Sequence, residues 1–230
     1  MSKNWTFAWR MSFRMVGWIF PMVSLLALAI LSAFPDLQSR VIEIVLPLVA
    51  ALQAAFLFAP DDEPALELLL SSPRPAAWLI YERLSAVLLM QLSIGLVWSV
   101  LISGIPGKPS VSALVVGWLP PTLALIGLAA TITFMMRRSS FGLLAAIFIY
   151  GAILFAGDSA VMQWNFTHPV HLFLQREGAF FLGMMWNTSP DNIYAFNRVV
   201  VTLIGVACIG WIVYSLRDAE KVLGVGNRGQ

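Results

Sequence analysis

The feature that most constrains the fold is a series of long apolar runs separated by short polar segments. A helix needs about 20 mostly apolar residues to cross the hydrocarbon core of a membrane, which is roughly 30 Å thick. Six runs reach or approach this length, at 15–34, 41–59, 84–104, 112–136, 141–157 and 198–216. Their apolar residues do not alternate, and backbone groups in lipid must be hydrogen-bonded within the segment. We therefore expect an all-α integral membrane protein with six transmembrane helices.

The composition agrees with lipid as the main solvent of the chain. Of the 230 residues, 59% are hydrophobic and 11% are charged, whereas soluble domains average about 25% charged residues. The net charge is only +2 and the basic residues occur singly or in pairs, so we expect no nucleic-acid partner. The single cysteine, Cys208, excludes a disulfide within the chain and a cysteine-based zinc cluster.

The distribution of lysine and arginine predicts the orientation in the membrane. Six spans put both ends of the chain on one side, and ten of the 14 basic residues fall on that side. Because cytoplasmic loops carry the excess of Lys and Arg, we expect both termini, the 60–83 segment and the 137–140 turn in the cytoplasm. Residues 1–14 mix four aromatic side chains with Lys and Arg, which predicts a helix lying in the membrane surface. A frayed polar terminus is the alternative.

A proline-bracketed acidic segment, FAPDDEPALELLLSSPRPAAW (58–78), interrupts the apolar pattern. Each charge at the centre of a span costs about 2.5–3.5 kcal/mol, so its four acids keep this segment out of the bilayer. Pro64 suits the first turn of a short helix, and Pro73 ends it. Leucines at i, i+3 and i+4 within 66–70 form one face, and so short a helix is marginal in water unless it docks. The two alternatives are an interfacial helix on lipid, which its acids disfavour, and a docking knob for a soluble partner.

The string LELLLSSP (66–73), preceded by acids and followed ten residues after Pro73 by Arg83, resembles the ABC-2-type transporter permeases, the membrane subunits of ABC exporters. The chain departs from that pattern at Pro64-Ala65, where Gly-Thr is usual, and at Glu82, where Gly is usual. A second, weaker resemblance lies in WNTSPDNIYAFNRVVVTLIG (186–205), which has Tyr-x-x-Asn-Arg before the last span.

The resemblance implies a coupling helix at 61–73 that sits in a cleft of a separate ATP-binding subunit. It also implies two copies of that subunit, with ATP and magnesium bound there, and a second permease subunit, identical or related, across a substrate path. The chain is then a multi-pass protein of a prokaryotic cell membrane without an ATPase site or cofactor of its own, acting in export. The predicted coupling residues are Asp62, Glu63, Leu66, Glu67, Leu69, Leu70 and Arg74.

The loops and tail complete this expected organisation as a single transmembrane domain over 1–230. Residues 158–197 are expected to form short amphipathic helices on the external side before the sixth span, because a structureless loop of that length is unusual. Residues 217–230 are expected to be a cytoplasmic tail.

Weakly polar residues in the spans are the other candidate site. Four of them recur at every fourth position of the third span: Gln91, Gly95, Ser99 and Ser103. Such a stripe indicates close helix packing, with the lining of a substrate path as the alternative. Glu43, three residues after Arg40, is expected to form a surface ion pair. The middles of the spans carry no ionisable residue, which argues against a proton-coupled carrier and favours an amphiphilic or apolar substrate.

Other chemistries have weaker support. Two glycine-containing strings, GVGNRG (224–229) and GIPGKPS (104–110), lack the strand, helix and Ser or Thr that a nucleotide site needs. His168 and His171 suggest metal or haem handling, but Pro169 separates them and no third ligand is fixed. No catalytic, cofactor-binding or metal-binding residues are predicted. A non-transporting scaffold or assembly subunit of a larger complex, and a small intramembrane enzyme, are the alternatives to transport.

Overall fold

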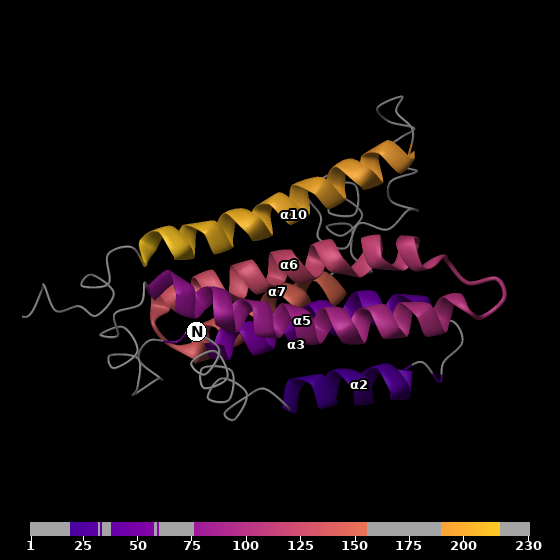
Figure 1. Ribbon diagram of the computed structural model, residues 1–230, viewed down its shortest axis with the longest axis horizontal. Helices are drawn as coiled ribbons and strands as arrows, with labels where there is room; N and C mark the ends of the chain where they lie inside the picture. The colour runs from indigo at the N-terminus through magenta and orange to yellow at the C-terminus, as the bar shows by residue number, and fades with distance from the viewer. Residues whose placement is uncertain are drawn as a thin grey trace, which may run out of the picture.

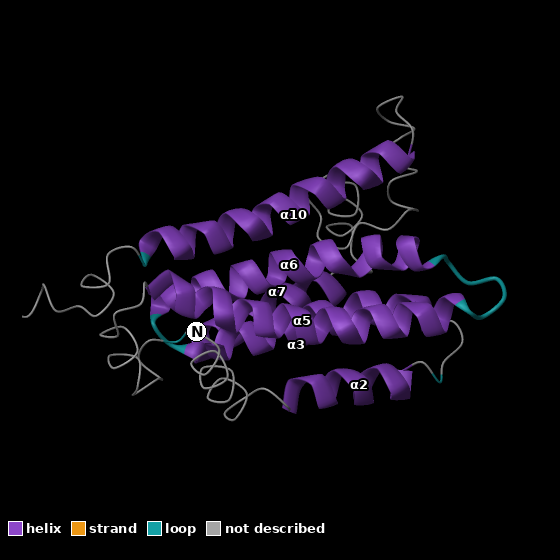
Figure 2. Cartoon of the chain, viewed as in Figure 1, coloured by secondary structure: helices purple, strands orange, loops and turns teal. Residues whose placement is uncertain are grey.

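The computed structural model describes residues 19–31, 33, 38–57, 59, 76–155 and 190–216. Every regular element within these ranges is an α-helix, which confirms the expected all-α class for this part of the chain (Figure 2). The helices are α2 (Ile19–Leu31), α3 (Gln38–Leu57), α5 (Ala76–Ser103), α6 (Val111–Met136), α7 (Ser139–Phe155) and α10 (Pro190–Ser215). The expected helices at 1–14 and 61–73, the segment 158–189 and the tail 217–230 lie outside the described residues.

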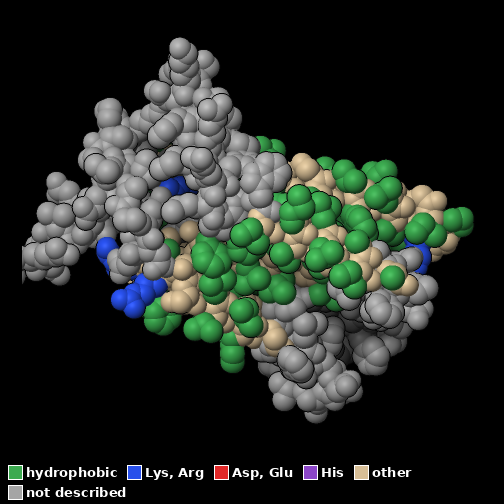
Figure 3. Space-filling model, turned by 90° about the horizontal axis from the view of Figure 1, so that it is seen from below, with side chains coloured by type: hydrophobic (Ala, Val, Ile, Leu, Met, Phe, Trp, Pro, Cys, Tyr) green, Lys and Arg blue, Asp and Glu red, His purple; other side chains and the backbone are tan. Residues whose placement is uncertain are grey.

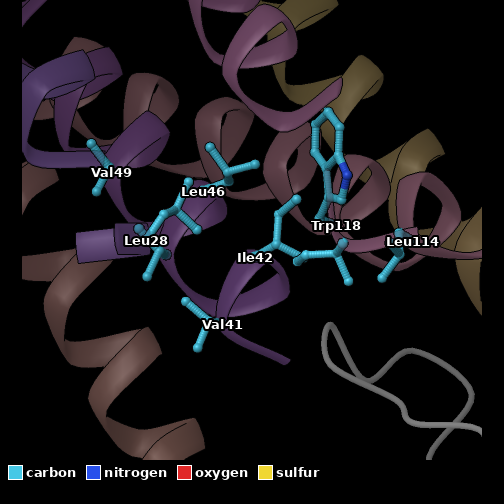
Figure 4. Close-up of a cluster of buried hydrophobic side chains, with 9 residues drawn as sticks. Leu28, Val41, Ile42, Leu46, Val49, Leu114 and Trp118 are labelled. Carbon is cyan, nitrogen blue, oxygen red and sulfur yellow. The ribbon is translucent and has the colours of Figure 1, made fainter. Parts of the chain in front are cut away.

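Two hydrophobic clusters show the direction in which the helices run. One joins late residues of α3 and α6, and the end of α10 with the residue after it, to the first half of α5: Ala50, Ala54, Leu84, Val87, Ile126, Ala130, Ile212 and Leu216. The other joins early residues of α3 and α6 to late residues of α2 and α5, including Leu28, Val41, Ile42, Leu46, Val49, Ile102, Leu114 and Trp118 (Figure 4). Because the end of one helix meets the beginning of the next, consecutive helices alternate in direction, as Figure 1 shows.

The alternation gives the bundle two distinct ends. The Arg137 end, named for the two-residue turn between α6 and α7, holds the ends of α3 and α10 and the beginnings of α2 and α5 (Figure 1). The Gly107 end, named for the turn between α5 and α6, holds the beginnings of α3 and α10. Ser110 caps α6 there, since its hydroxyl accepts from the backbone N–H of Ala113 at 3.4 Å.

The central helix is α6, which contacts α3, α5, α7 and α10. Two-thirds of its most apolar stretch is buried (67%), against 33% for α5 and 28% for α10. The outer helix α10 approaches α6 at a pair of glycines. A Cβ at Gly205 would lie 2.6 Å from the carbonyl oxygen of Leu123, and one at Gly127 would lie 2.7 Å from the carbonyl oxygen of Gly205. Only glycine allows this backbone separation, as is common where membrane helices cross.

Among the described residues, three helical segments are long and apolar enough to cross a membrane: Tyr81–Ser103, Val111–Met136 and Tyr194–Ser215. Shorter apolar segments are Ile19–Ile30, Val41–Phe56 and Ser139–Ile149. Large hydrophobic side chains also cover much of the outside of the bundle, with Lys and Arg near its ends (Figure 3). An outer surface of this kind is unfavourable in water, and together these features indicate a membrane protein.

Two helices begin earlier than the apolar pattern predicts. α5 begins at Ala76 instead of at 84, and α10 begins at Pro190 instead of at 198, inside the stretch expected to be an external segment. The added turns carry buried polar residues that hydropathy leaves outside a span, namely Glu82, Arg83 and Asn197. A membrane helix tolerates such polar residues when other parts of the same chain bury them. Proline suits the first turn of α10 at position 190, because the N–H that it lacks would have no partner within the helix there.

Candidate functional site

A chain of buried polar side chains joins three helices in the Arg137 half of the bundle. The amide nitrogen of Gln91 on α5 donates to the amide oxygen of Gln53 on α3 at 2.9 Å. The amide oxygen of Gln91 accepts from the hydroxyl of Ser24 on α2 at 3.3 Å. The three residues are 0–2% exposed. In so apolar a setting each bond satisfies a group that would otherwise be buried at a cost, so this polar chain fixes how α2, α3 and α5 sit together.

One and two turns further along α5, the same face packs against a tryptophan of α6. A Cβ at Gly95 would lie 2.5 Å from the ring atom Cζ2 of Trp118, so the glycine makes room for the indole. The indole N–H of Trp118 donates to the hydroxyl oxygen of Ser99 at 3.1 Å. Trp118 and Ser99 are both fully buried. Gly95 thus leaves space for the indole ring and Ser99 accepts its hydrogen bond, so that α6 packs closely against α5.

The four residues of the predicted stripe therefore fall into two groups according to their contacts. The structure brings Gln91, Gly95 and Ser99 into contacts between helices, whereas the hydroxyl of Ser103 donates to the carbonyl of Val100 in its own helix. The contacts of the first three residues are those of helix packing.

Sequence reasoning missed the partners of this stripe, namely Ser24, Gln53 and Trp118. Gln53 carried a usable signal, since an amide inside the apolar run 41–59 must find a hydrogen-bonding partner in another span. A serine or a tryptophan in such a run carries a much weaker signal, because both occur there with no partner in another helix.

An acidic side chain also points into the bundle. The carboxyl of Glu43 on α3 lies against Gly117 of α6, where any Cβ would overlap it. The residue is half-buried. The sequence predicted a surface pair with Arg40, whose side chain lies outside the described residues. The missing side chain at Gly117 lets the carboxyl sit between α3 and α6 instead of on the outer surface.

Buried polar residues also lie near the beginnings of α5 and α10, at opposite ends of the bundle. Glu82 and Arg83 are 7% and 8% exposed at the Arg137 end. Asn197 and Arg198 are 0% and 5% exposed at the Gly107 end, and the Arg198 guanidinium lies 4.7 Å from the ring centre of Tyr194. A guanidinium over an aromatic face gains a favourable cation–π interaction. Tyr194, Asn197 and Arg198 are the residues of the second, weaker resemblance.

The predicted coupling residues, from Asp62 to Arg74, lie outside the described residues, as do His168 and His171. Within the part of the chain that the structure describes, no three His, Cys, Asp or Glu side chains gather where they could hold a metal ion.

Comparison of the chain with models of known protein families, with curated proteins and with solved structures found no match in any of the three. The function is therefore inferred from the residues of this chain and their positions.

Proposed function

We propose that this chain is the permease subunit of an ABC transporter, acting in export with a separate ATP-binding subunit. The observation that carries the proposal is the acidic, proline-bracketed segment 58–78 with its LELLLSSP string. Support comes from the helices that flank it. α3 and α5 pack side by side and run in opposite directions, so the segment connects two helix termini at the same end of the bundle. A helix in this segment is connected directly to α3 and α5, so a movement of a docked partner would reach both helices.

The proposal includes six spans with both termini in the cytoplasm. The alternating directions of α2, α3, α5, α6, α7 and α10 are compatible with six crossings. Arg83, Arg137 and Arg138 lie at the Arg137 end, and they belong to the ten of 14 basic residues that the sequence pattern predicts to be cytoplasmic. The acidic segment then lies on the cytoplasmic side, where an ATP-binding subunit works.

In this mechanism two permease subunits, identical or related, form the substrate path between them in the bilayer. Each is driven by one of two ATP-binding subunits, which hold ATP and magnesium. The coupling residues Asp62, Glu63, Leu66, Glu67, Leu69, Leu70 and Arg74 seat in that subunit. Motion passes directly to α3 and α5, which flank the coupling segment. The bonds of Gln91 to Gln53 and Ser24 join these helices to α2, so the three move together.

The test is reconstitution with an ATP-binding subunit of the ABC class from the same source, identified as the product of a neighbouring gene. The chain is co-purified with that protein in lipid discs, and ATP hydrolysis is compared with that of the ATPase alone. The Leu69→Asp/Leu70→Asp variant replaces two apolar anchors by charges, so we expect loss of association and of stimulated hydrolysis, by at least about tenfold for a docking loss of some 1.4 kcal/mol.

Ser112→Asp is the matched control, because it adds a charge at an exposed position of the opposite end. We expect it to keep association and stimulation, and both variants to elute as the wild type does with unchanged helical content. Unchanged association and stimulation in the Leu69→Asp/Leu70→Asp variant would sink the coupling role.

A further inference from the structure

The turn between α6 and α7 consists of two arginines. α6 ends at Met136 and α7 begins at Ser139, so Arg137 and Arg138 alone connect them. Arg137 has φ of 62°, and it is the single non-glycine residue with positive φ among those described. The position after a helix in this left-handed conformation is usually glycine, since any other side chain costs free energy there. The turn thus has an arginine at a position where glycine is the usual residue.

Exposed apolar side chains surround this cationic turn. Met135 and Met136 are 61% and 53% exposed at the end of α6, and Phe141 is 46% exposed in the first turn of α7. Arg138 is exposed as well. We call these four residues and Arg137 the α6–α7 surface. The corresponding turn at the Gly107 end carries one cation, Lys108. Of these two turns, it is therefore the one at the Arg137 end that combines adjacent guanidinium groups with large exposed apolar side chains.

The position of the α6–α7 surface explains why it combines arginines with exposed apolar side chains. It lies at the end of a helix that is long and apolar enough to cross a membrane. In a membrane crossed by α6, the apolar side chains at this level would meet acyl chains and the arginines would reach the layer of lipid phosphates. A guanidinium donates two parallel hydrogen bonds to a phosphate, which a lysine ammonium does not.

We propose that the α6–α7 surface binds the headgroups of acidic phospholipids, with its apolar side chains in contact with their acyl chains. The occupant is membrane lipid of negative net charge, such as phosphatidylglycerol, and not a soluble acidic protein. We commit to lipid because these apolar side chains lie at the end of a helix long enough to cross a membrane, and a lipid has both a phosphate and an acyl chain. This binding requires a membrane but not the proposed ABC-transporter function.

The experiment uses the full chain in lipid discs of phosphatidylcholine, without and with phosphatidylglycerol. The thermal unfolding midpoint is measured, and the lipids retained by the protein are counted by native mass spectrometry. We expect phosphatidylglycerol to raise the midpoint of the wild type by several degrees, with retained phosphatidylglycerol molecules. Raising the salt concentration should shrink the shift, because salt screens exposed charges.

The variants separate lipid binding from folding. Arg138→Gln should lose about half of the shift, since each basic residue near the surface contributes separately. Arg137→Gly should be as stable as the wild type or more so in phosphatidylcholine, because glycine accepts the positive φ without strain. The double variant should show no phosphatidylglycerol-dependent shift. Lys108→Gln, at the opposite end, is the matched control and should retain most of it.

Two results would overturn the proposal. One is a double variant that keeps the full phosphatidylglycerol shift and the same number of retained lipids. The other is a wild type whose unfolding midpoint does not rise with phosphatidylglycerol and which retains no phosphatidylglycerol.

Discussion

At the scale of single residues, the bundle depends on a few polar groups that have very specific partners. Gln91 holds two of them at once, Gln53 and Ser24, through its amide nitrogen and oxygen. Such a group is favourable only while its partners remain, because an unpaired buried donor or acceptor costs about 1–3 kcal/mol. The same cost does not arise when both partners are replaced by apolar side chains of similar size.

Replacing Gln91 therefore has an effect that depends on Gln53. We expect Gln91→Leu to lower the free energy of unfolding by about 1–3 kcal/mol, because it leaves the oxygen of Gln53 buried without a donor. The double variant Gln53→Leu/Gln91→Leu should recover part of that loss. Unfolding in detergent measures both. Ser103→Ala is the control, since the hydroxyl bonds within its own helix, and we expect a change within about 0.5 kcal/mol. A double variant that is no more stable than Gln91→Leu alone contradicts the pairing.

At the scale of elements, the position of each helix depends on how closely its backbone can approach α6. α5 approaches at Gly95, which makes room for the Trp118 ring, and α10 approaches at Gly205 and Gly127. α7 approaches at Gly142, where a Cβ would overlap the hydroxyl of Thr133 on α6. Three neighbours of the central helix thus use an absent side chain at the contact.

Gly205→Ala tests this close approach. The added methyl would lie 2.6 Å from the carbonyl group of Leu123, and backbone cannot move aside as a flexible side chain can. We expect α10 to shift from α6 and the free energy of unfolding to fall by about 1–3 kcal/mol. Gly210→Ala, on the same helix, has nothing within 4 Å of the added methyl. It should be neutral, or more stable by up to about 1 kcal/mol, because alanine is the better helix former. Equal effects of the two substitutions on the unfolding midpoint would refute the close-contact explanation.

At the scale of the whole molecule, the alternation of helix directions puts the α5–α6 and α6–α7 turns, which both carry basic residues, at opposite ends of the bundle. The α6–α7 turn has adjacent arginines and the α5–α6 turn has Lys108 alone. If all six apolar runs cross the membrane, ten of the 14 basic residues of the sequence fall on the side that includes Arg137, which predicts that this end is cytoplasmic.

Cysteine labelling measures that orientation. Cys208→Ser removes the single native thiol, and Ser112→Cys or Ser140→Cys then places one exposed thiol at either end. We expect a membrane-impermeant thiol reagent to label Ser112→Cys in intact cells and Ser140→Cys only after permeabilisation. Labelling of both from the same side would exclude a crossing by α6, and the reverse pattern would invert the topology.

The sequence by itself determined the helical class, the apolar exterior and the approximate ranges of the helices, because lipid requires continuous hydrogen-bonded backbone with apolar side chains around it. It was less accurate at the beginnings of α5 and α10. There Glu82, Arg83 and Asn197 are buried within the helices, so hydropathy placed the beginning of each span too late.

Only the tertiary structure decided what the polar stripe contacts. The spacing of Gln91, Gly95 and Ser99 puts them on one face of a helix, but the spacing is the same for a packed face and for a substrate path. Their partners, Gln53, Ser24 and Trp118, come from three other helices. The physical reason is that periodicity describes one helix at a time, whereas hydrogen bonds and close contacts between helices depend on how those helices are arranged in space.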